Sequence, residues 1–404
     1  MTRNEGQNVP GGEVALVHDW LNGMRGGERC LELLAKEWPE APIYTLLYKP
    51  EGVSEAIRAH RVTESRLGRI PGFREKYRWF LPLFPGAIEA MRAPEGTRLV
   101  VSTSHCVAKG FRPPPGARHL CYCFTPMRYA WGFQDDYFGR GGLKRRMIDV
   151  ALGRLRRWDA ASARRVDRFV AISEHVRERI ARHYGRPASV VYPPVNTAFY
   201  TPAEGSDAAR EGAAAALRAG GVAADEAARV AAEGYDLVVS ALVPYKRIDL
   251  AVEAARATGR TLVIAGSGGE EAKLRAGVPG NVLFAGRPDD AGVRALYRGC
   301  RCLVFPGEED FGIVPLEVQS CGRPVVAFGR GGALETVEEE RTGVFFREQT
   351  PEALAEALAR VDAADWDAPA IRAHAEPFGE ARFLREMRRE VAAVLGPDPE
   401  EGTL

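Results

Sequence analysis

Residues 307–321 of the chain read GEEDFGIVPLEVQSC and connect an apolar run, residues 302–305, to a glycine at position 322. The apolar run predicts a buried strand. The acidic residues after Gly307 end that strand. The pattern from Ile313 then predicts a helix that stops at Gly322, because glycine is the usual residue just past a helix C-terminus. A strand, a loop and a helix in this order are typical of a parallel α/β domain.

Two glutamates and a helix N-terminus make this stretch a candidate binding site. Glu309 falls in the predicted loop, and Glu317 falls about one turn inside the helix. Phe311 and Gly312 fall at the helix start, where unpaired N–H groups and the helix dipole attract anions. Carboxylates beside an anion site suit a ligand with hydroxyls and phosphates, such as a sugar nucleotide. An acidic surface loop followed by a structural helix glutamate explains the spacing equally well.

Length and composition restrict the class of protein. The chain has 404 residues, more than one ordinary core accommodates, so two domains are expected. The net charge of +1 gives no electrostatic support for nucleic-acid binding. Seven cysteines without a regular framework predict reduced thiols in a cytoplasmic protein. The sequence shows neither a signal peptide nor an apolar stretch of about 20 residues.

Alternation of strand and helix patterns occurs twice along the chain. It predicts two Rossmann-like, doubly wound parallel-sheet domains of the α/β class that face a central crevice. The expected N-terminal domain covers residues 1–203, and the expected C-terminal domain covers residues 235–375. Residues 204–234 are rich in alanine and glycine and are interpreted as a linker or insertion. Residues 376–404 are expected to carry a last helix that crosses back to the N-terminal domain.

Small and polar residues at predicted strand ends are further candidates for the crevice. Gly26 and Gly27 follow the first strand, where they either form a turn or bring N–H groups close to phosphate. His105 follows a strand and has either a structural role or a ligand contact. Lys246 follows the first strand of the second domain. It is either a surface lysine or a neutralising group for a diphosphate.

Two segments of the N-terminal half combine basic and apolar character. Residues 73–92 mix aromatic and basic side chains, and residues 140–168 hold ten arginines and lysines against three aspartates. Residues 73–92 either pack on their own domain or form a membrane-surface patch. Residues 140–168 either form a solvated helix face or face anionic lipid or a phosphorylated acceptor.

The chain resembles the family 4 (group 1) retaining glycosyltransferases of the GT-B fold. The most specific match is the E-x7-E pattern from Glu309 to Glu317, with Phe311-Gly312 inside it. Shorter matches support it: GGE at 26–28, LVPYKR at 242–247, AGSG at 265–268, and GG at 331–332 with Glu335. HDW at 18–20 and the loop at 125–131 are similar to a subgroup that builds bacterial surface polysaccharides, often by mannosyl transfer.

The resemblance implies a role for each matching residue. Glu309 would hold hydroxyls of the donor sugar, Glu317 the ribose, and Lys246 the diphosphate. His105 would touch the donor sugar, so the expected catalytic group is His105, Glu309 and Lys246. Further donor contacts are implied for Gly26, Gly27, Arg247, Gly266, Arg287, Phe311, Gly312, Ile313 and Val314. Acceptor contacts are implied for Asp19, Arg128, Tyr129 and Trp131.

Two positions depart from the family pattern. The family usually carries an arginine five residues before the lysine, where this chain has Ala241. Half of the cationic pair on the diphosphate is therefore missing, unless Arg247 or a basic residue of the other domain replaces it. The related subgroup tends to carry a histidine where Phe124 stands, so an acceptor contact there is in question.

The expected reaction transfers a hexosyl group from a GDP- or UDP-sugar to a hydroxyl of a glycan, a lipid-linked compound or another small acceptor. Retention, no metal and no cofactor are expected, with mannose from GDP-mannose as one donor. Two alternatives stay open. One is a related sugar-nucleotide epimerase or a phosphorylase, and the other is a non-catalytic sugar-nucleotide-binding partner of a glycan-assembly complex. The protein is expected in the cytoplasm, with peripheral attachment to the inner face of the membrane as an option.

Overall fold

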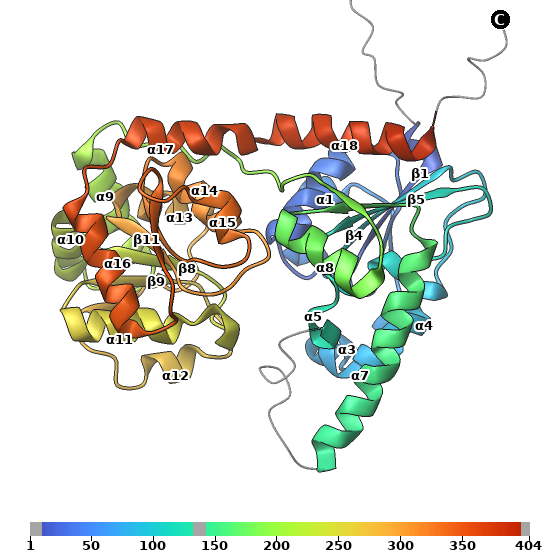
Figure 1. Ribbon diagram of the computed structural model, residues 1–404, viewed down its shortest axis with the longest axis horizontal. Coiled ribbons are helices and arrows are strands. Elements are labelled where there is room, and N and C mark those ends of the chain that lie inside the picture. The colour runs from blue at the N-terminus through green and yellow to red at the C-terminus, as the bar shows by residue number, and fades with distance from the viewer. Residues whose placement is uncertain (1–9, 132–142, 397–404) are drawn as a thin grey trace, which may run out of the picture. The chain divides into compact units, whose positions relative to one another are not determined.

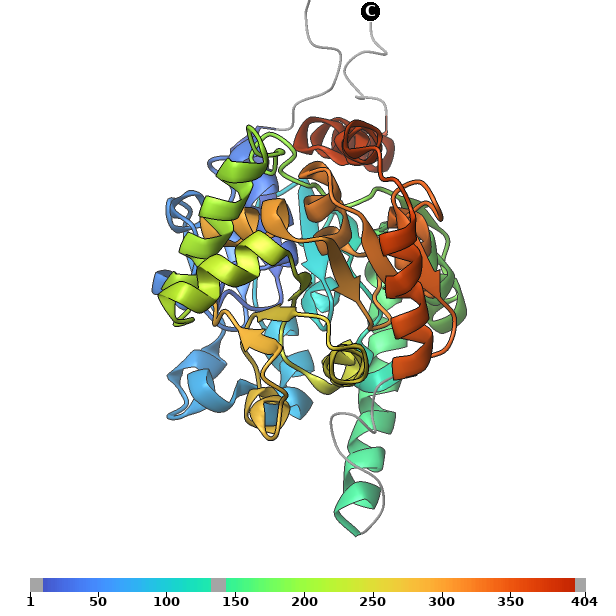
Figure 2. The same cartoon turned by 90° about the vertical axis from the view of Figure 1, so that its left-hand side faces the viewer.

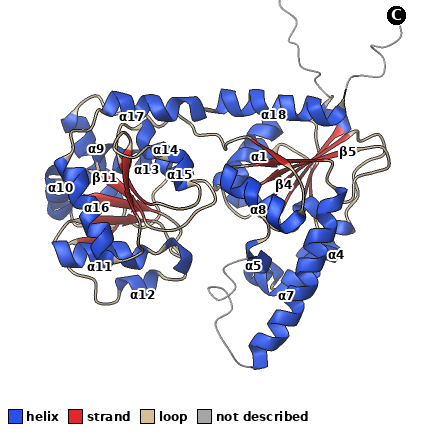
Figure 3. Ribbon diagram, in the orientation of Figure 1, coloured by secondary structure: helices blue, strands red, loops and turns tan. Residues whose placement is uncertain are grey.

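A computed structural model describes residues 10–131 and 143–396 of the chain. It divides into two units (Figure 1). Unit 1 consists of Met1–Pro194 and Ala381–Leu404, and unit 2 consists of Val195–Glu380. In each unit the strands lie inside a cover of helices (Figure 3). The predicted α/β class with two parallel-sheet domains is confirmed.

Unit 1 is built on a seven-stranded sheet in which all neighbouring strands are parallel. The strand order is β3-β2-β1-β4-β5-β6-β7. Its strands are β1 (Val14–His18), β2 (Ile43–Thr45), β3 (Val62–Glu64), β4 (Leu99–Ser104), β5 (Arg118–Cys123), β6 (Arg168–Ala171) and β7 (Ala188–Val190). The chain reverses its direction across the sheet between β1 and β4. The carboxyl ends of these two strands therefore mark the expected ligand edge.

The helices of unit 1 cover this sheet. The longer helices are α1 (Gly26–Glu37), α7 (Leu143–Ser162), α8 (Glu174–Tyr184) and α18 (Glu380–Leu395), and the short ones are α2 (Glu55–Arg58), α3 (Phe73–Lys76), α4 (Phe84–Glu89) and α5 (Arg128–Trp131). Helix α18 comes from the end of the chain and packs on unit 1. Phe383 is fully buried against Tyr122, and Arg388 forms two hydrogen bonds of 2.7 Å with Glu37.

Unit 2 is built on a six-stranded parallel sheet in the order β10-β9-β8-β11-β12-β13. Its strands are β8 (Asp236–Val239), β9 (Leu262–Ala265), β10 (Val282–Phe284), β11 (Cys302–Phe305), β12 (Val325–Phe328) and β13 (Gly343–Phe346). Side chains alternate between two core clusters, as strand geometry requires. Leu237 and Leu303 belong to one cluster, and Val238 and Val304 belong to the other.

The helices of unit 2 lie on both sides of its sheet. They are α9 (Ser206–Ala219), α10 (Ala224–Glu233), α11 (Ile248–Thr258), α12 (Glu271–Arg275), α13 (Asp290–Gly299), α14 (Ile313–Ser320), α15 (Ala333–Thr336), α16 (Pro351–Ala363) and α17 (Ala368–Ala375). In Figure 2, α9 and α10 (yellow-green) lie on one side of the strands and α16 (orange-red) on the other. None of the helices within residues 10–131 and 143–396 is both long and apolar enough to cross a membrane.

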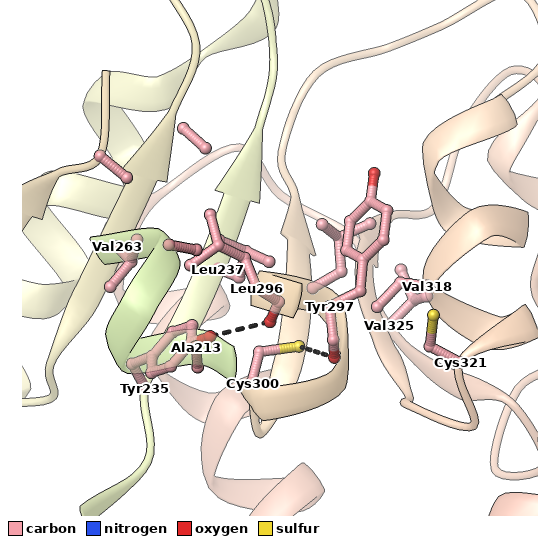
Figure 4. Close-up of a cluster of buried hydrophobic side chains, with 14 of the residues drawn as sticks. Ala213, Tyr235, Leu237, Val263, Leu296, Tyr297, Cys300, Val318, Cys321 and Val325 are labelled. Atoms are coloured by element: carbon pink, nitrogen blue, oxygen red, sulfur yellow. Dashed lines mark hydrogen bonds between the residues drawn. The ribbon is translucent and has the colours of Figure 1, made fainter. Parts of the chain in front are cut away.

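Residues 204–234 are not the linker or insertion that their composition suggests. They form α9 and α10, whose inward residues Ala213, Leu217 and Val230 are fully buried. These residues join the same core cluster as Leu296 of α13 (Figure 4). Alanine-rich helices bury little area per residue, but their small side chains let α9 pack closely on α13, so the segment belongs to the core of unit 2.

Candidate active site

Four loops meet at the carboxyl edge of the unit 2 sheet, and together they are called the loop cluster: residues 240–247, 266–270, 306–312 and 329–332. Backbone hydrogen bonds join them in pairs. The Leu242 N–H donates to Ser267 O at 3.0 Å, and the Gly332 N–H donates to Glu309 O at 2.8 Å. Since these loops follow β8, β9, β11 and β12, the parallel sheet brings together segments that lie far apart in the sequence.

Two glycines make this close approach possible. A Cβ on Gly332 would lie 2.2 Å from the Phe311 Cα atom, and a Cβ on Gly266 would lie 1.8 Å from Ser240 O. Gly266 also has φ of +142°, which L side chains rarely adopt. Gly266, predicted as a donor-contacting residue, thus has a structural reason to be glycine here.

Lys246 and Glu309 form an ion pair within the loop cluster. Their side chains are 20% and 11% exposed, so the ion pair is mostly shielded from solvent but part of it still reaches the surface. The structure therefore brings together two of the three residues of the expected catalytic group. A cation and a carboxylate in contact offer a ligand one group for phosphate oxygens and one for hydroxyls.

Helix α14 starts immediately beyond this pair. Its N-cap residue Gly312 has φ of +115° and supplies no side-chain cap. Ile313 and Val314 follow in the first turn, where N–H groups lack partners within the helix. The predicted position of Phe311 and Gly312 at a helix start is confirmed. This N-terminus can therefore present N–H groups and a positive dipole end to an anion.

Glu317 lies farther along α14 and is held by a tyrosine. The buried Tyr297 hydroxyl donates to Glu317 Oε2 at 2.8 Å. Figure 4 shows the Tyr297 ring in the core cluster with its hydroxyl on the side away from Tyr235. Burial raises the pKa of Tyr297, so the phenol keeps its proton and remains a donor. Sequence reasoning missed this contact, because its only local signal is a tyrosine in the helix before β11.

The departure at Ala241 is not repaired by Arg247 in the described arrangement. Ala241 is exposed, and Arg247 caps α11 with φ of +51°. The Arg247 guanidinium contacts Asp249 at 3.1 Å and Gln349 at 3.4 Å. Its charge is thus already balanced, and a diphosphate would have to compete with Asp249. Arg287, another implied donor contact, is exposed shortly after the end of β10.

At the carboxyl edge of unit 1, Asp19 holds the loop after β4. It is fully buried, and its carboxylate accepts N–H groups of His105 (2.7 Å), Cys106 (2.9 Å), Val107 (2.6 Å) and Ala108 (2.7 Å). The prediction that Asp19 points at the acceptor is corrected accordingly. Both oxygens of the Asp19 carboxylate accept hydrogen bonds from backbone N–H groups, which would otherwise be buried without partners.

His105 is the group that Asp19 positions. Its Nδ1 lies 3.2 Å from Asp19 Oδ2, and its ring meets Trp20 edge-on at 4.3 Å between centroids. The His105 side chain is only partly exposed. Its burial lowers the pKa of His105, which favours the neutral ring near pH 7. A neutral, oriented imidazole can exchange hydrogen bonds with a sugar hydroxyl.

The glycine-rich turn lies at the start of α1, close to the same edge. A Cβ on Gly27 would lie 3.2 Å from the Phe124 ring and 3.6 Å from His18 Cε1. Gly26 occupies the first position of α1, and Glu28 accepts the Arg25 N–H at 3.2 Å as part of a capping box. Close packing therefore explains a glycine at position 27, and the start of α1 lies against the last residue of β1 and the residue after β5.

Three of the four residues predicted to bind the acceptor, Arg128, Tyr129 and Trp131, belong to α5. Tyr129 and Trp131 pack against the core of unit 1, and Arg128 is partly exposed. Trp131 donates from Nε1 to Asp159 Oδ2 at 2.7 Å and stacks on His183 at 4.6 Å. The polar atom of Trp131 is thus engaged inside unit 1, so the predicted acceptor contact would have to come from the Trp131 ring rather than from its N–H group.

The aromatic and basic segments also have structural partners. Arg156 donates to Ala130 O, and Arg165 and Arg168 pair with Glu89 and Glu390. Of the basic stretch 140–168, residues 140–142 lie outside the described residues. In the part of the chain that the structure describes, no group of three His, Cys, Asp or Glu side chains is placed to hold a metal ion.

Two family models match the chain. The model for Glycosyltransferase Family 4 matches residues 24–199, and the model for Glycosyl transferases group 1 matches residues 229–365. The second range contains the whole loop cluster, with Lys246 and Glu309, and also Glu317 of α14.

Curated relatives match parts of the chain. A D-inositol 3-phosphate glycosyltransferase of Salinispora arenicola is 30% identical over 58% of this chain and 57% of its own. A glycogen synthase of Thermus thermophilus is 36% identical over 31% of this chain and 30% of its own. An uncharacterized glycosyltransferase of Methanocaldococcus jannaschii is 35% identical over 26% of this chain and 28% of its own. The matches thus span less than two thirds of these relatives.

Solved structures share the fold over nearly the whole chain. Sucrose-phosphate synthase from Thermosynechococcus elongatus has a TM-score of 0.65 at 19% identity, covering 94% of this chain and 99% of that one. HepE of Anabaena, in complex with UDP and glucose, has a TM-score of 0.64 at 17% identity, covering 97% and 100%. With family models matching both halves and this fold throughout, the chain belongs to the group 1, family 4 glycosyltransferases of the GT-B type.

Proposed function

We propose that the protein is a retaining glycosyltransferase that moves a hexosyl group from a nucleoside-diphosphate sugar to a hydroxyl of a glycan or a lipid-linked acceptor. The observation that carries this proposal is the grouping of the Lys246–Glu309 pair, the start of α14 and Glu317 at one sheet edge. The cation and the N–H groups suit a diphosphate, and the carboxylates suit sugar and ribose hydroxyls.

The leaving diphosphate gains negative charge as the glycosidic bond breaks, and fixed donors stabilise it. Lys246 is held in place by Glu309, so little reorganisation is needed. Loss of one such donor typically costs about 2.7–4 kcal/mol of barrier. The proposed step is front-face attack, in which the departing phosphate accepts the proton of the acceptor hydroxyl. It uses no metal and no cofactor.

Donor and acceptor are proposed at the level of chemical class. The HepE structure contains UDP and glucose, while the resemblance to polysaccharide-building enzymes favours mannose from GDP-mannose. Both nucleotides therefore belong in the first test. A lipid-linked acceptor would place the enzyme at the inner face of a membrane, as a peripheral protein.

Thermal unfolding with GDP, UDP, ADP and dTDP tests the site. A nucleotide at about 100 times its dissociation constant should add roughly 2.7 kcal/mol to the free energy of unfolding. Lys246→Met and Glu317→Ala should lose most of that gain. Lys273→Met, which removes an exposed lysine of α12, should retain it. No shift with any nucleotide would contradict the proposed donor site.

A non-catalytic sugar-nucleotide-binding protein is the second candidate, and the exposed Ala241 favours it. Such a protein would show the thermal shift without consuming donor. Incubation with the sugar nucleotide that stabilises best separates the two, since even a slow transferase hydrolyses some donor over hours. Release of nucleoside diphosphate that stops in Lys246→Met would exclude the pure binding role.

A further inference from the structure

A short stretch of unit 1 divides its apolar side chains between the core and the surface. Residues 66–89 form η3 (Arg66–Arg69), α3, η4 (Tyr77–Leu83) and α4. Buried members of the stretch are Leu67, Phe73, Tyr77, Leu81 and Phe84. Exposed members are Ile70 (37%), Trp79 (81%) and Leu83 (51%). The segment therefore has a full core-facing side and still turns three large apolar groups outward.

This exposure is unusual for the molecule. Five large hydrophobic side chains of the described residues are exposed, and three of the five fall in this stretch. Tryptophan is highly buried on average, so an indole at 81% exposure calls for a specific explanation. Trp79, Pro82 and Leu83 are all exposed on the same short helix, η4, and these three residues are together called the apolar edge.

Exposed basic residues accompany this apolar edge in the same stretch of sequence. Residues 66–83 contain five basic residues and one acidic residue, Glu75. All five basic residues are exposed: Arg66, Arg69, Arg74, Lys76 and Arg78. Arg74 pairs with Glu64 at 2.9 Å, and the Arg78 guanidinium lies 5.3 Å from the Tyr77 ring centre. The stretch thus combines an exposed indole with a local excess of cations.

We propose that residues 66–83 form a docking surface for an anionic lipid bilayer. A bilayer offers both partners at once, because anionic headgroups lie directly above an apolar layer. The Trp79 indole occupies the interface between the two, as tryptophan does in membrane proteins, and Ile70 and Leu83 enter the apolar side. This surface would bring the enzyme to a lipid-linked acceptor. Only that role rests on the proposed function, because lipid binding itself does not depend on it.

Co-sedimentation with vesicles tests the proposal without any sugar donor. Vesicles of phosphatidylcholine alone are compared with equal parts of phosphatidylcholine and phosphatidylglycerol, at about 0.15 M and about 1 M salt. Wild-type protein is expected to bind the anionic vesicles and to release at high salt. Trp79→Ala/Leu83→Ala should bind at least about tenfold more weakly. In Arg69→Gln/Lys76→Gln, each lost charge should weaken binding about fivefold.

Matched controls lie on unit 2. Leu334→Ala removes another exposed apolar side chain, and Arg218→Gln/Lys273→Gln removes two exposed charges. These variants should bind like the wild type. All the substituted side chains of the docking surface are exposed, so circular dichroism and the nucleotide-induced thermal shift should be unchanged in them. That shift separates this proposal from the donor site, because either one can fail while the other holds.

Three results would overturn the proposal. One is equal vesicle binding by wild type and Trp79→Ala/Leu83→Ala, and another is no binding of the wild type to either vesicle. The third is self-association of the wild type that needs Trp79 and occurs without vesicle binding, because the apolar edge would then be an interface between copies of the chain.

Discussion

The Tyr297 hydroxyl is the contact that fixes Glu317 on α14. A hydrogen bond to a charged group contributes about 1.5–3 kcal/mol, and its loss removes this restraint on the Glu317 carboxylate. We expect Tyr297→Phe to lower nucleotide affinity about three- to tenfold, measured by titration calorimetry. Tyr235→Phe is the matched control. Its hydroxyl is equally buried but donates to Leu296 O, so affinity should not change. Equal affinity loss in both variants would refute a specific role for Tyr297.

Glu28 should make stability depend on pH. Burial, opposed in part by Arg25, raises its pKa from 4.5 to about 7. The folded protein therefore keeps a proton that the unfolded chain has lost. Its stabilising contribution is complete below pH 4.5 and is lost as pH rises to about 7, a change of about 3 kcal/mol.

Glu28→Gln tests this dependence, because the amide oxygen can still accept the Arg25 N–H. Urea denaturation at about pH 5 and about pH 8 should show a smaller loss of stability in the variant than in the wild type. Parallel losses in both proteins would show that other groups cause the pH dependence.

At the scale of single residues, the sequence predicts a contact only when its partners lie close together along the chain. Glu309 and Glu317 lie in one local strand–loop–helix pattern, so the sequence alone places them correctly around a helix start. The partners of Asp19 lie 86 to 89 residues away, so nothing near it shows that its oxygens are occupied. Tyr297 is likewise 20 residues from Glu317. Long-range polar contacts depend on the packed fold, and single-sequence patterns do not contain them.

Among the loops, the contact between residues 329–332 and 306–312 is a tight constraint on the site. Gly332→Ala would place a Cβ 2.2 Å from Phe311 Cα, so the two loops must separate. We expect loss of nucleotide stabilisation and a fall of more than about 1 kcal/mol in the free energy of unfolding, measured with and without nucleotide. Gly269→Ala is the control, since no atom lies within 4 Å of its Cβ position. Wild-type nucleotide binding by Gly332→Ala would show that the loops need not touch.

Elements differ in how well their patterns identify them. The buried strand β11 was predicted at its full length, because its apolar run is bounded by clear breaks. Strands β2 and β3 were missed, since each has only three residues and β3 is only partly buried. Helices α9 and α10 were misread, because alanine-rich sequence resembles a linker when the helix that it packs against is unknown.

The whole molecule consists of two units, and α18 makes unit 1 discontinuous in sequence. The repeated strand–helix alternation predicts two domains, because each run is long enough for one sheet. The boundary at Pro194 and Val195 lies earlier than residue 203, since the segment after it already belongs to unit 2. Tyr200 packs in the unit 2 core, and Arg372 donates to Tyr200 O at 3.2 Å. The short stretch 195–203 has neither a strand nor a helix pattern, so the boundary cannot be located from the sequence.

Separate cores predict separate unfolding transitions. Phe383 of α18 is fully buried in unit 1, and its removal should cost about 3–5 kcal/mol. Leu358 of α16 is buried in the core of unit 2, and its removal should cost about 2–5 kcal/mol. In scanning calorimetry, Phe383→Ala should lower one transition and Leu358→Ala the other. A stabilising nucleotide should raise the transition that Leu358→Ala lowers, because the loop cluster belongs to unit 2. If both variants lower a single shared transition, the two units unfold as one cooperative body, and α18 then links the stability of the nucleotide site to that of unit 1.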